Sequence, residues 1–364
     1  MSEITIPRTM RAIVEDEAAR WAVLKEVPVP KLESNEVLVK VKYVALNPTD
    51  WVHAEFLSPD GVIQGNDFSG EIVKLGSNLA VNLKIGDLIA GSSLGGHFKD
   101  SGSFAQYLKV QSDLVYKIPH AVSLQDAPTY GVGWATAGHV IIHNQKHQFP
   151  PAKITDSKSW YIIYGGSGSV GLFAIQLAKL LGYKVLTFCS NHSFDLVKSY
   201  GADIAIDYHD EEEAIKKALE ATNGIGSVFA LDTINNTSSN KITAKSMGKL
   251  GVQLNTFQPI SIGQQGLEQL NPNLKNVTTL LYTVQGKSFA FTPRDKENPT
   301  ILPVVKEDRE FGVEFYKRTP EFIEKYGLKP NPVAVKGGLD DILQGMADMK
   351  AGKVSGVKYV YKIH

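Results

Sequence analysis

A cluster of glycines at residues 165–171 is the part of this sequence that points most directly to chemistry. It reads GGSGSVG, in which Gly166, Gly168 and Gly171 form the pattern G-x-G-x-x-G. The apolar run WYIIY precedes it, and a segment with apolar residues at helical spacing follows. In a strand–turn–helix setting, glycines let the backbone approach a phosphate, and the free N–H groups at the helix start bind the anion. The pattern predicts a dinucleotide site; the alternative is a tight turn that binds nothing.

The residues that follow the second strand of this unit indicate which dinucleotide is bound. An NAD site usually carries an acid roughly 20 residues beyond the glycines, where it binds the ribose 2′-hydroxyl. Here residues 188–193 read FCSNHS, and the first acid is Asp195. Hydroxyl, amide and imidazole groups accept a 2′-phosphate that an acid would repel, so we predict NADPH. The alternative is that residues 190–192 only form a turn and a helix cap. The predicted contacts are Gly166, Ser167, Gly168, Ser169 and Val170 in the turn, and Ser190, His192, Ser193 and Tyr208 beyond it.

The elements that must position this site fall into two groups. Before about residue 130 the chain consists of short strand-like runs, such as EVLVKVKYVAL, separated by Gly, Pro, Asn and Asp. A helical segment at residues 127–147 then leads into strands that alternate with helices, which is typical of a doubly wound parallel sheet. The final stretch reads as strand, helix, strand and could close onto the first lobe. Residues 257–275 and 286–300 are expected to be loops.

These patterns predict an α/β fold with two domains. We expect a β-rich domain at residues 1–133 and 304–364, and a Rossmann domain at residues 134–303. The chain has 364 residues, which is enough for both cores.

Composition argues against several classes of protein. The formal net charge is zero, so no basic field attracts nucleic acid or anionic lipid. Cys189 is the only cysteine, which excludes an intrachain disulfide and cysteine-rich zinc sites. We find neither a targeting pattern at the N-terminus nor an apolar run of membrane-spanning length. We therefore expect a cytoplasmic protein that acts on a small molecule, as a monomer or homodimer.

Seven motifs resemble those of a known superfamily. The segments ALNPTDW, GNDFSGEIVKLG, GDLIAG, GSFAQYLKV, ATAG, YGGSGSVG and GKVSGVK occur in the order found in medium-chain dehydrogenases/reductases. The sequence resembles most the zinc-independent branch: quinone oxidoreductases, yeast NADPH-dependent alcohol dehydrogenase-like proteins and fungal trans-acting enoyl reductases. The resemblance implies a GroES-like β-rich catalytic domain flanking the Rossmann domain, with the active site in the cleft between them.

The positions that match the catalytic zinc ligands of relatives carry other residues here. They are Asn47, Asn66 and Val132, where zinc relatives have Cys, His and Cys. None of the three is a good zinc ligand, so we predict no metal.

The resemblance also assigns cofactor roles outside the glycine turn. Asn47, at the position of the first zinc ligand of relatives, is expected to contact the cofactor. Thr136 matches a threonine near the nicotinamide carboxamide, and Lys358 matches a C-terminal lysine near the cofactor. Lys358 could equally be a solvated surface lysine. Asp232, Asn255 and Phe257 follow Rossmann strands, at the edge of the sheet where ligands bind, and the latter two could be only loop residues.

A site without a metal favours a particular chemistry. NADPH supplies a hydride, and a conjugated C=C–C=O acceptor spreads the resulting charge into an enolate that hydrogen-bond donors stabilise. The catalytic candidates are Thr49, which matches a proton-relaying hydroxyl of zinc relatives, His53 and Tyr130. Tyr282 is a further donor or wall residue. Asp50 more simply braces its loop, and His53 and both tyrosines could be structural.

The predicted activity is reduction of enones, enals, quinones or reactive carbonyls. One alternative is a trans-acting enoyl reductase on carrier-bound acyl chains, although Val52 stands where fungal members have lysine. Another is a non-catalytic NADPH-binding regulator.

Two further groups of titratable residues are expected to be solvated faces. His139, His143 and His147 have the spacing of metal ligands on a helix, but we expect them on its outer face. Residues 211–213 are three glutamates, which suit the start of an exposed helix.

Overall fold

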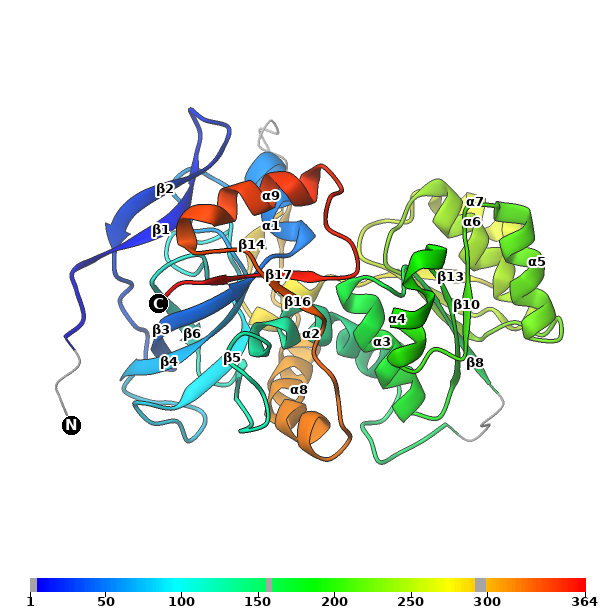
Figure 1. Ribbon diagram of the computed structural model, residues 1–364, viewed down its shortest axis with the longest axis horizontal. Helices are drawn as coiled ribbons and strands as arrows, with labels where there is room; N and C mark the ends of the chain where they lie inside the picture. Colours follow the sequence, from blue (N-terminus) through cyan, green and yellow to red (C-terminus); the bar gives the residue numbers. More distant parts are fainter. Residues whose placement is uncertain (1–4, 155–158, 292–298) are drawn as a thin grey trace. The chain divides into compact units, whose positions relative to one another are not determined.

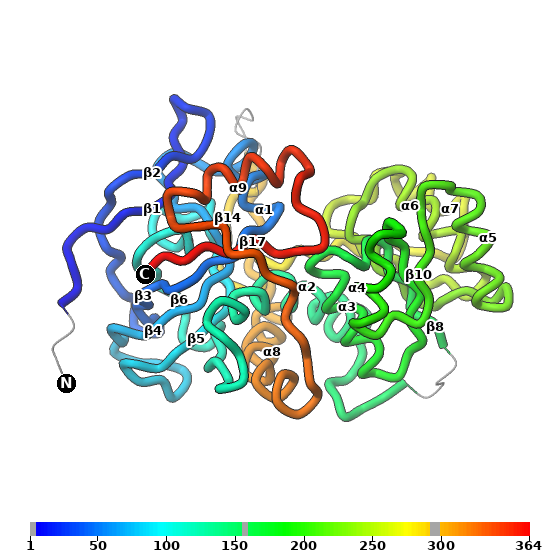
Figure 2. The backbone as a smooth tube through the Cα atoms, viewed as in Figure 1, coloured from blue at the N-terminus to red at the C-terminus, as the bar shows by residue number. Residues whose placement is uncertain are grey.

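The structure is a computed structural model that describes residues 5–154, 159–291 and 299–364, and the chain divides into two compact units (Figures 1 and 2). One unit runs to Ala135 and resumes at Tyr282; the other is Thr136–Leu281. The expected domain boundaries fall after residues 133 and 303, whereas these units divide after Ala135 and Leu281. The described residues between 282 and 303 belong to the β-rich unit.

The β-rich unit is built around a seven-stranded sheet in the order β16-β17-β3-β4-β5-β7, with β6 also paired to β3. Its strands are β3 (Glu36–Ala45), β4 (Asp67–Leu75), β5 (Leu88–Ser92), β6 (Tyr107–Gln111), β7 (Val115–Lys117), β16 (Val333–Val335) and β17 (Lys358–Lys362). Separate pairs are formed by β1 (Thr9–Asp16) with β2 (Trp21–Pro28), and by β14 (Phe289–Ala290) with β15 (Ile301–Leu302).

The chain's last strand completes this sheet, as the sequence predicts. Val360 of β17 pairs with Ala45 of β3 in antiparallel register, and Figure 1 shows the red β17 beside the blue β3. Most of the β-branched run in β3 is buried, and strands pair with its backbone on both edges. The helices of this unit are α1 (Pro48–Val52), η1 (His53–Leu57), η2 (Ala127–Tyr130), α8 (Lys306–Glu324), η7 (Leu339–Asp341) and α9 (Ile342–Lys350). Two further helices, α2 (Val132–Gly138) and η6 (Leu281–Gln285), cross the unit boundaries.

The second unit is the predicted Rossmann domain. Six parallel strands have the order β10-β9-β8-β11-β12-β13, so the chain moves outward from β8 to one side and then from β11 to the other. That reversal between β8 and β11 is the topological switch point, beside which ligands of such sheets bind. Its strands are β8 (Trp160–Tyr164), β9 (Lys184–Phe188), β10 (Ile204–Ile206), β11 (Phe229–Asp232), β12 (Gln253–Thr256) and β13 (Lys275–Thr278). Its helices are η3 (His139–Asn144), α3 (Ser169–Leu180), η4 (Asn191–Ser193), α4 (Phe194–Ser199), α5 (Glu211–Ala221), α6 (Thr237–Ser246), η5 (Gly248–Leu250) and α7 (Gly263–Leu270).

Two of the local expectations need correction. Residues 257–275 are not a loop throughout, because α7 forms there and buries Leu267 in the core of the sheet. The segment 127–147 is not one helix: it divides into a 3-10 turn, an α-helix and a π-helix that ends at Asn144. The expectation for residues 286–300 falls partly outside the described residues; within it, β14 is a strand.

No helix among the described residues combines the length and apolar character needed to cross a bilayer.

The contact between α9 and β17 gives a test of the closed β-rich sheet. At Gly345 of α9, a Cβ atom would lie 1.7 Å from the Tyr361 hydroxyl oxygen of β17. We expect Gly345→Ala to lower the free energy of unfolding by about 1–3 kcal/mol through overpacking. Gln344→Ala, one residue earlier on the exposed face, should change it by less than about 0.5 kcal/mol. Denaturant titration compares the two, and equal stabilities would show that α9 does not pack on β17 as described.

Candidate functional site

The glycine turn joins β8 to α3 in the conformation that its sequence predicts. Gly165 has φ of +80°, a left-handed conformation that favours glycine. A Cβ at Gly166 would lie 1.9 Å from the Thr187 hydroxyl of β9, so the turn can lie against the neighbouring strand only without a side chain. The backbone N–H groups of both glycines donate to the Phe188 carbonyl, at 2.9 and 3.3 Å.

Gly168 has a different role from the other glycines of the turn. It is the exposed N-cap of the twelve-residue helix α3, and a Cβ there would meet only the Gly165 carbonyl, at 3.3 Å. The backbone is therefore open on the side where the helix presents its free N–H groups. Ser167, Ser169 and Val170 are partly exposed beside it. This cradle fits the pyrophosphate of a dinucleotide.

The structure brings two of the predicted 2′-phosphate residues together. The Ser190 hydroxyl, after β9, donates to the Tyr208 hydroxyl, after β10, at 3.4 Å. His192 is exposed in the next turn, whereas Ser193 is buried.

An acid that the sequence analysis missed lies near this pair. Asp207 precedes Tyr208 and accepts from the Asn191 backbone N–H at 3.1 Å. The backbone N–H and the ring of His209 hold the pKa of Asp207 below its usual value, so it is charged at neutral pH. The spacing rule predicts an acid only in the residues that directly follow β9. Asp207 instead follows the adjacent strand β10, so the rule does not find it.

The other Rossmann residues named as cofactor contacts have partners within their own unit. The Asp232 carboxylate accepts from the N–H groups of Ile234 and Asn235 and from two side chains of α6, at 2.6–2.9 Å. Asn255 is buried, and its amide joins Gln145 and Thr279 at 3.0 and 3.2 Å. These bonds fix the loops around the switch point. Thr136 is buried in α2, and Phe257 follows β12.

The β-rich unit contains a buried polar network at the positions that match the zinc ligands. Lys358 is only 4% exposed, and its ammonium donates to the Asn47 side-chain oxygen and lies 3.2 Å from Asp67 Oδ2. The Asn47 amide donates to the same Asp67 oxygen at 2.8 Å. The Val132 backbone N–H donates to the other Asp67 oxygen at 2.6 Å. Lys358 is thus not a surface lysine.

A second buried carboxylate extends this network to the helix that carries Thr49. Asp50 accepts from the Asn47 backbone N–H and the Asn66 amide, both at 2.7 Å. Burial raises the pKa of Asp50 to about 7, and burial also raises the pKa of Asp67 despite the Lys358 ammonium. The expected bracing role of Asp50 agrees with these bonds, because they close the first turn of α1.

The donor set of this network does not fit zinc. The three matched positions contribute two amides and a backbone N–H, and the Lys358 ammonium lies against Asn47 and Asp67. Zinc prefers thiolate, imidazole and carboxylate ligands, and the two carboxylates of this network, Asp67 and Asp50, are already engaged by the Lys358 ammonium and by N–H donors. The positively charged group in this network is the Lys358 ammonium, which donates hydrogen bonds and has no lone pair for a metal ion.

A chain of hydroxyl and imidazole groups lies beside this network. The Thr49 hydroxyl hydrogen-bonds the Tyr282 hydroxyl and lies 2.9 Å from His53 Nε2. Burial raises the pKa of Tyr282, so its hydroxyl stays protonated, while burial lowers the pKa of His53 to about 3 and keeps that ring neutral. The structure therefore brings Thr49 and His53 together, with Tyr282 as the third member.

Tyr130 does not join this chain. Its side chain is fully buried, and its hydroxyl donates to the Leu328 carbonyl at 2.9 Å. The ring also packs edge-on against Tyr116. These contacts give Tyr130 a packing role rather than the catalytic one that the sequence suggested.

The expectation of a solvated histidine face is wrong. His139 is buried in η3, and His147 lies beyond the end of that helix. His147 donates through Nδ1 to the Ile141 carbonyl at 2.8 Å, and its Nε2 accepts from the Tyr183 hydroxyl at 2.7 Å. The periodicity suggested one helix face, but the helix ends at Asn144. The acidic start of α5 is confirmed, with Asp210 as its N-cap.

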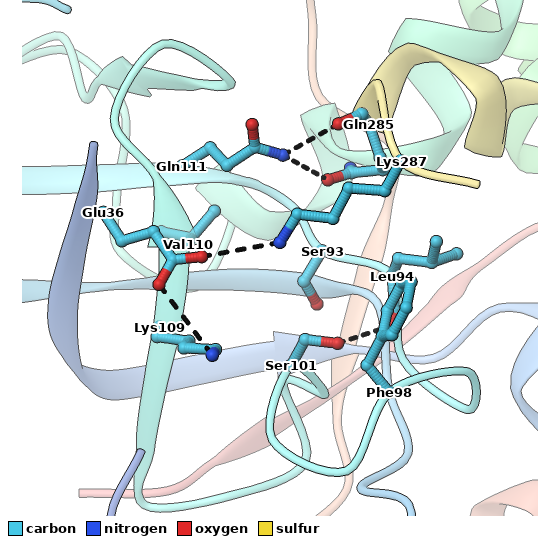
Figure 3. A pocket seen from close by; sticks show the side chains of 10 residues that line it. All are labelled: Glu36, Ser93, Leu94, Phe98, Ser101, Lys109, Val110, Gln111, Gln285 and Lys287. Carbon is cyan, nitrogen blue, oxygen red and sulfur yellow. Dashed lines mark hydrogen bonds and ion pairs between the residues drawn. The ribbon is translucent and has the colours of Figure 1, made fainter. Parts of the chain in front are cut away.

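A small hollow lies elsewhere in the β-rich unit, and Figure 3 shows its lining. The buried Glu36 carboxylate faces Lys109 at 3.9 Å and Lys287 at 3.6 Å, and Gln111 donates to the Gln285 carbonyl at 2.9 Å. Because the lysines face carboxylates within the unit, the hollow has no excess of positive charge for an anionic ligand.

Comparisons with known proteins agree with this geometry. The family model for the alcohol dehydrogenase GroES-like domain matches residues 33–120, and the model for zinc-binding dehydrogenase matches residues 169–253. Trans-enoyl reductase ACTTS2 of Alternaria alternata is 38% identical over 98% of this chain and 99% of its own length. Trans-enoyl reductase TOXD of Cochliobolus carbonum is 37% identical over 77% of this chain and 91% of its own.

Solved structures share the fold at lower identity. The quinone oxidoreductase from Coxiella burnetii has a TM-score of 0.69 at 21% identity, covering 98% of this chain and all of that one. The CurK enoyl reductase has a TM-score of 0.75 at 18% identity, with the same coverage.

The chain therefore belongs to the medium-chain dehydrogenase/reductase family of oxidoreductases, whose reductases bind a nicotinamide cofactor. Both curated relatives described above are trans-enoyl reductases.

The buried ion pair gives a prediction about stability. Lys358→Met leaves the Asp67 carboxylate buried without its ammonium, which we expect to cost about 3–5 kcal/mol of unfolding free energy at neutral pH. Without the ammonium, the already raised pKa of Asp67 rises further. Between the unfolded and folded pKa values, Asp67 therefore holds a proton in the folded variant and releases it in the unfolded chain. The variant should therefore lose stability as the pH rises from about 4, the unfolded pKa, through the raised folded value.

Denaturant titration across that pH range measures the effect. The double variant Lys358→Met/Asp67→Asn removes the charge and should regain much of the loss. If Lys358→Met matches wild type at every pH, the ion pair does not hold this unit together.

Proposed function

We propose that this protein is an NADPH-dependent, metal-independent reductase of conjugated C=C bonds in enones or enals, with quinones and reactive carbonyls as further acceptors. The observation that carries this proposal is the Tyr282–Thr49–His53 chain, which ends in a protonated hydroxyl and lies beside a network built on an ammonium. A conjugated acceptor needs hydrogen-bond donors and a proton rather than a metal.

The cofactor supplies the hydride when bound, and the protein's residues handle the proton. Addition of hydride at the β-carbon moves the C=C electron pair into an enolate. Tyr282 gives its proton to the α-carbon of that enolate, and Thr49 returns a proton to the Tyr282 oxygen. His53 replaces the Thr49 proton through Nε2, so each turnover takes one proton from solvent. A phenol with a raised pKa keeps its proton until the strongly basic enolate forms.

The absence of metal from this reaction is supported by the donor set. Asn47 and Asn66 offer neutral amides, and both are hydrogen-bonded to the buried carboxylates. A divalent ion would have to displace the Lys358 ammonium, which is buried and already paired with Asp67.

The preference for NADPH is supported by the Ser190–Tyr208 pair. Two hydroxyls and the exposed His192 imidazole offer hydrogen bonds to a 2′-phosphate. Asp207 opposes this preference, but its carboxylate is engaged by Asn191 and by the His209 backbone and ring.

A second candidate is reduction of enoyl thioesters on a carrier protein. Full-length relatives named trans-enoyl reductases favour it. Val52, where the fungal enzymes resembled by this sequence have lysine, does not.

The substrate class and the proton donor can be tested together. We expect NADPH oxidation with a small enone or quinone, and Tyr282→Phe should lower kcat by about 100-fold because the proton donor is lost. Tyr326→Phe, at a half-buried tyrosine beyond α8, should keep the wild-type rate. Absorbance of NADPH follows both reactions.

Other outcomes separate the alternatives. If the enzyme consumes only carrier-linked enoyl thioesters and no free enone or thioester, the second candidate is correct. If Tyr282→Phe reduces enones at the wild-type rate, Tyr282 is not the donor.

The cofactor preference has its own test. Ser190→Asp places a second carboxylate beside Tyr208, so we expect NADPH to bind at least about tenfold more weakly through charge repulsion, while NADH is spared. Ser199→Asp, on the exposed end of α4, serves as the matched control. Calorimetric titration with both nucleotides measures the affinities, and a wild-type protein that binds NADH as tightly as NADPH would contradict the proposed preference.

A further inference from the structure

The glycine turn of the Rossmann unit is held from both neighbouring strands. On the β9 side, its two N–H bonds to the Phe188 carbonyl fix it to that strand. On the β11 side, the Thr233 hydroxyl donates to the carbonyls of Tyr164 and Gly165, at 3.0 and 3.3 Å. A Cβ at Gly165 would lie 2.2 Å from that hydroxyl and 3.1 Å from the Ile234 side chain. The loop that follows β11 therefore lies directly on the first glycine of the turn.

That loop is shaped by Asp232 and Asn235. The Asp232 carboxylate accepts from the backbone N–H groups of Ile234 and Asn235, both at 2.9 Å. Asn235 has φ of +58°, in the left-handed region that residues other than glycine seldom adopt, although asparagine adopts it more readily than most. Such a conformation persists only where the surroundings hold it, and it is concentrated at functional sites. The bonds of the Asn235 side chain show what holds it here.

The Asn235 amide joins the loop after β11 to the loop after β12. Its nitrogen donates to the carbonyls of Gln258 and Pro259, at 3.3 and 3.1 Å. Its oxygen accepts from the Asn240 side chain of α6 at 3.1 Å. One partly exposed side chain thus bonds both loops at the carboxyl edge of the sheet, beside the switch point.

Asn240 completes this connection from within the unit. It is fully buried, and its nitrogen donates to Asp232 at 2.8 Å as well as to Asn235. Its oxygen accepts from the backbone N–H and the hydroxyl of Ser261, at 2.9 and 2.7 Å. All four hydrogen-bonding positions of this amide are used, and turning it over would place its oxygen against the Asp232 carboxylate. We call Asn235 and Asn240 together the amide bridge.

We propose that the amide bridge positions the glycine turn for binding of the cofactor's phosphates. Asn235 and Asn240 are positioning residues, because they act through the loop whose Thr233 hydroxyl holds the turn. A turn that is already fixed in its binding shape loses less conformational freedom when the anion binds, so its affinity is higher. This inference rests on the cofactor binding of the proposed function, but not on its acceptor or on the choice between NADPH and NADH.

The first experiment measures the affinities of NADPH and NADH by calorimetric titration. Asn235→Gly keeps the left-handed backbone but removes every bond of the side chain. We expect both dissociation constants to rise about tenfold with their ratio unchanged, because both nucleotides carry the same pyrophosphate. Asn223→Gly is the matched control, since Asn223 is exposed and has φ of +53°. Wild-type affinities in Asn235→Gly would overturn the proposal.

Steady-state kinetics separate positioning of the turn from a loss of folded enzyme. With an enone as acceptor, Asn235→Gly should raise the KM for NADPH by the same factor and leave kcat within about twofold of wild type, because saturating cofactor orders the turn. A smaller fraction of folded enzyme would instead lower kcat at an unchanged KM. That second pattern would contradict a positioning role.

The route through Thr233 can be tested with a second variant. Thr233→Val removes the hydroxyl that holds the turn but keeps a branched side chain, so it should also weaken the binding of both nucleotides. In the double variant Thr233→Val/Asn235→Gly, the losses of binding free energy should be less than additive, because both changes release the same contact. Strictly additive losses would show that Asn235 does not act through Thr233.

Hydrogen exchange tests the bridge without any nucleotide. In Asn235→Gly we expect faster amide exchange in the glycine turn at residues 165–171 and in the loop at residues 257–262, with unchanged exchange in β10 and α4. Faster exchange throughout the unit, or unchanged exchange in the turn, would refute the proposed role. If the wild-type protein binds neither nucleotide, the proposed function fails, and the exchange pattern still decides whether the bridge holds the turn.

Discussion

The site in the β-rich unit depends on one buried ion pair, between Lys358 of the last strand and Asp67 of β4. Asn47 bonds both partners, and its backbone N–H and Asp50 close the first turn of α1. That turn carries Thr49, so residues from the two ends of the sequence fix the position of one hydroxyl. A buried ammonium and carboxylate are stable only when each is paired and hydrogen-bonded. Replacing one partner alone is therefore expected to destabilise the unit. The pair also links β17 to β4, the two strands on either side of β3.

We propose that the same interaction separates this protein chemically from the zinc members of its family. Zinc polarises an oxygen directly, as a Lewis acid. Here the carboxylates of the network are engaged by the Lys358 ammonium and by amide donors, and the adjoining hydroxyl chain offers hydrogen-bond donors instead. Conjugated acceptors suit this arrangement, because their charge is delocalised and the protein must supply a proton rather than hold an alkoxide. The glycine turn, with its exposed N-cap Gly168, provides the complementary feature in the Rossmann unit.

Much of this could be predicted from the sequence, since local patterns specify local structure. The glycine turn, the alternation of strands and helices, and the returning C-terminal strand all follow from spacing and composition. Helix ends were less predictable: His147 continues the periodicity of His139, but η3 ends at Asn144. Contacts between distant residues left no signal. Asp207 reaches the Ser190 turn from a neighbouring strand, and His97 meets His53 only because the β5–β6 loop folds back. Tyr130 is a different case: the sequence suggests a catalytic donor, but the buried hydroxyl donates to the Leu328 carbonyl.

The central claim is that the acceptor is activated without a metal ion, and metal content measured together with activity tests it most directly. Purified protein should contain far less than one zinc ion per chain by elemental analysis. Its NADPH-dependent reduction of an enone should survive prolonged treatment with a strong chelator. One zinc ion per chain, with activity lost on chelation and regained on adding zinc, would contradict the account.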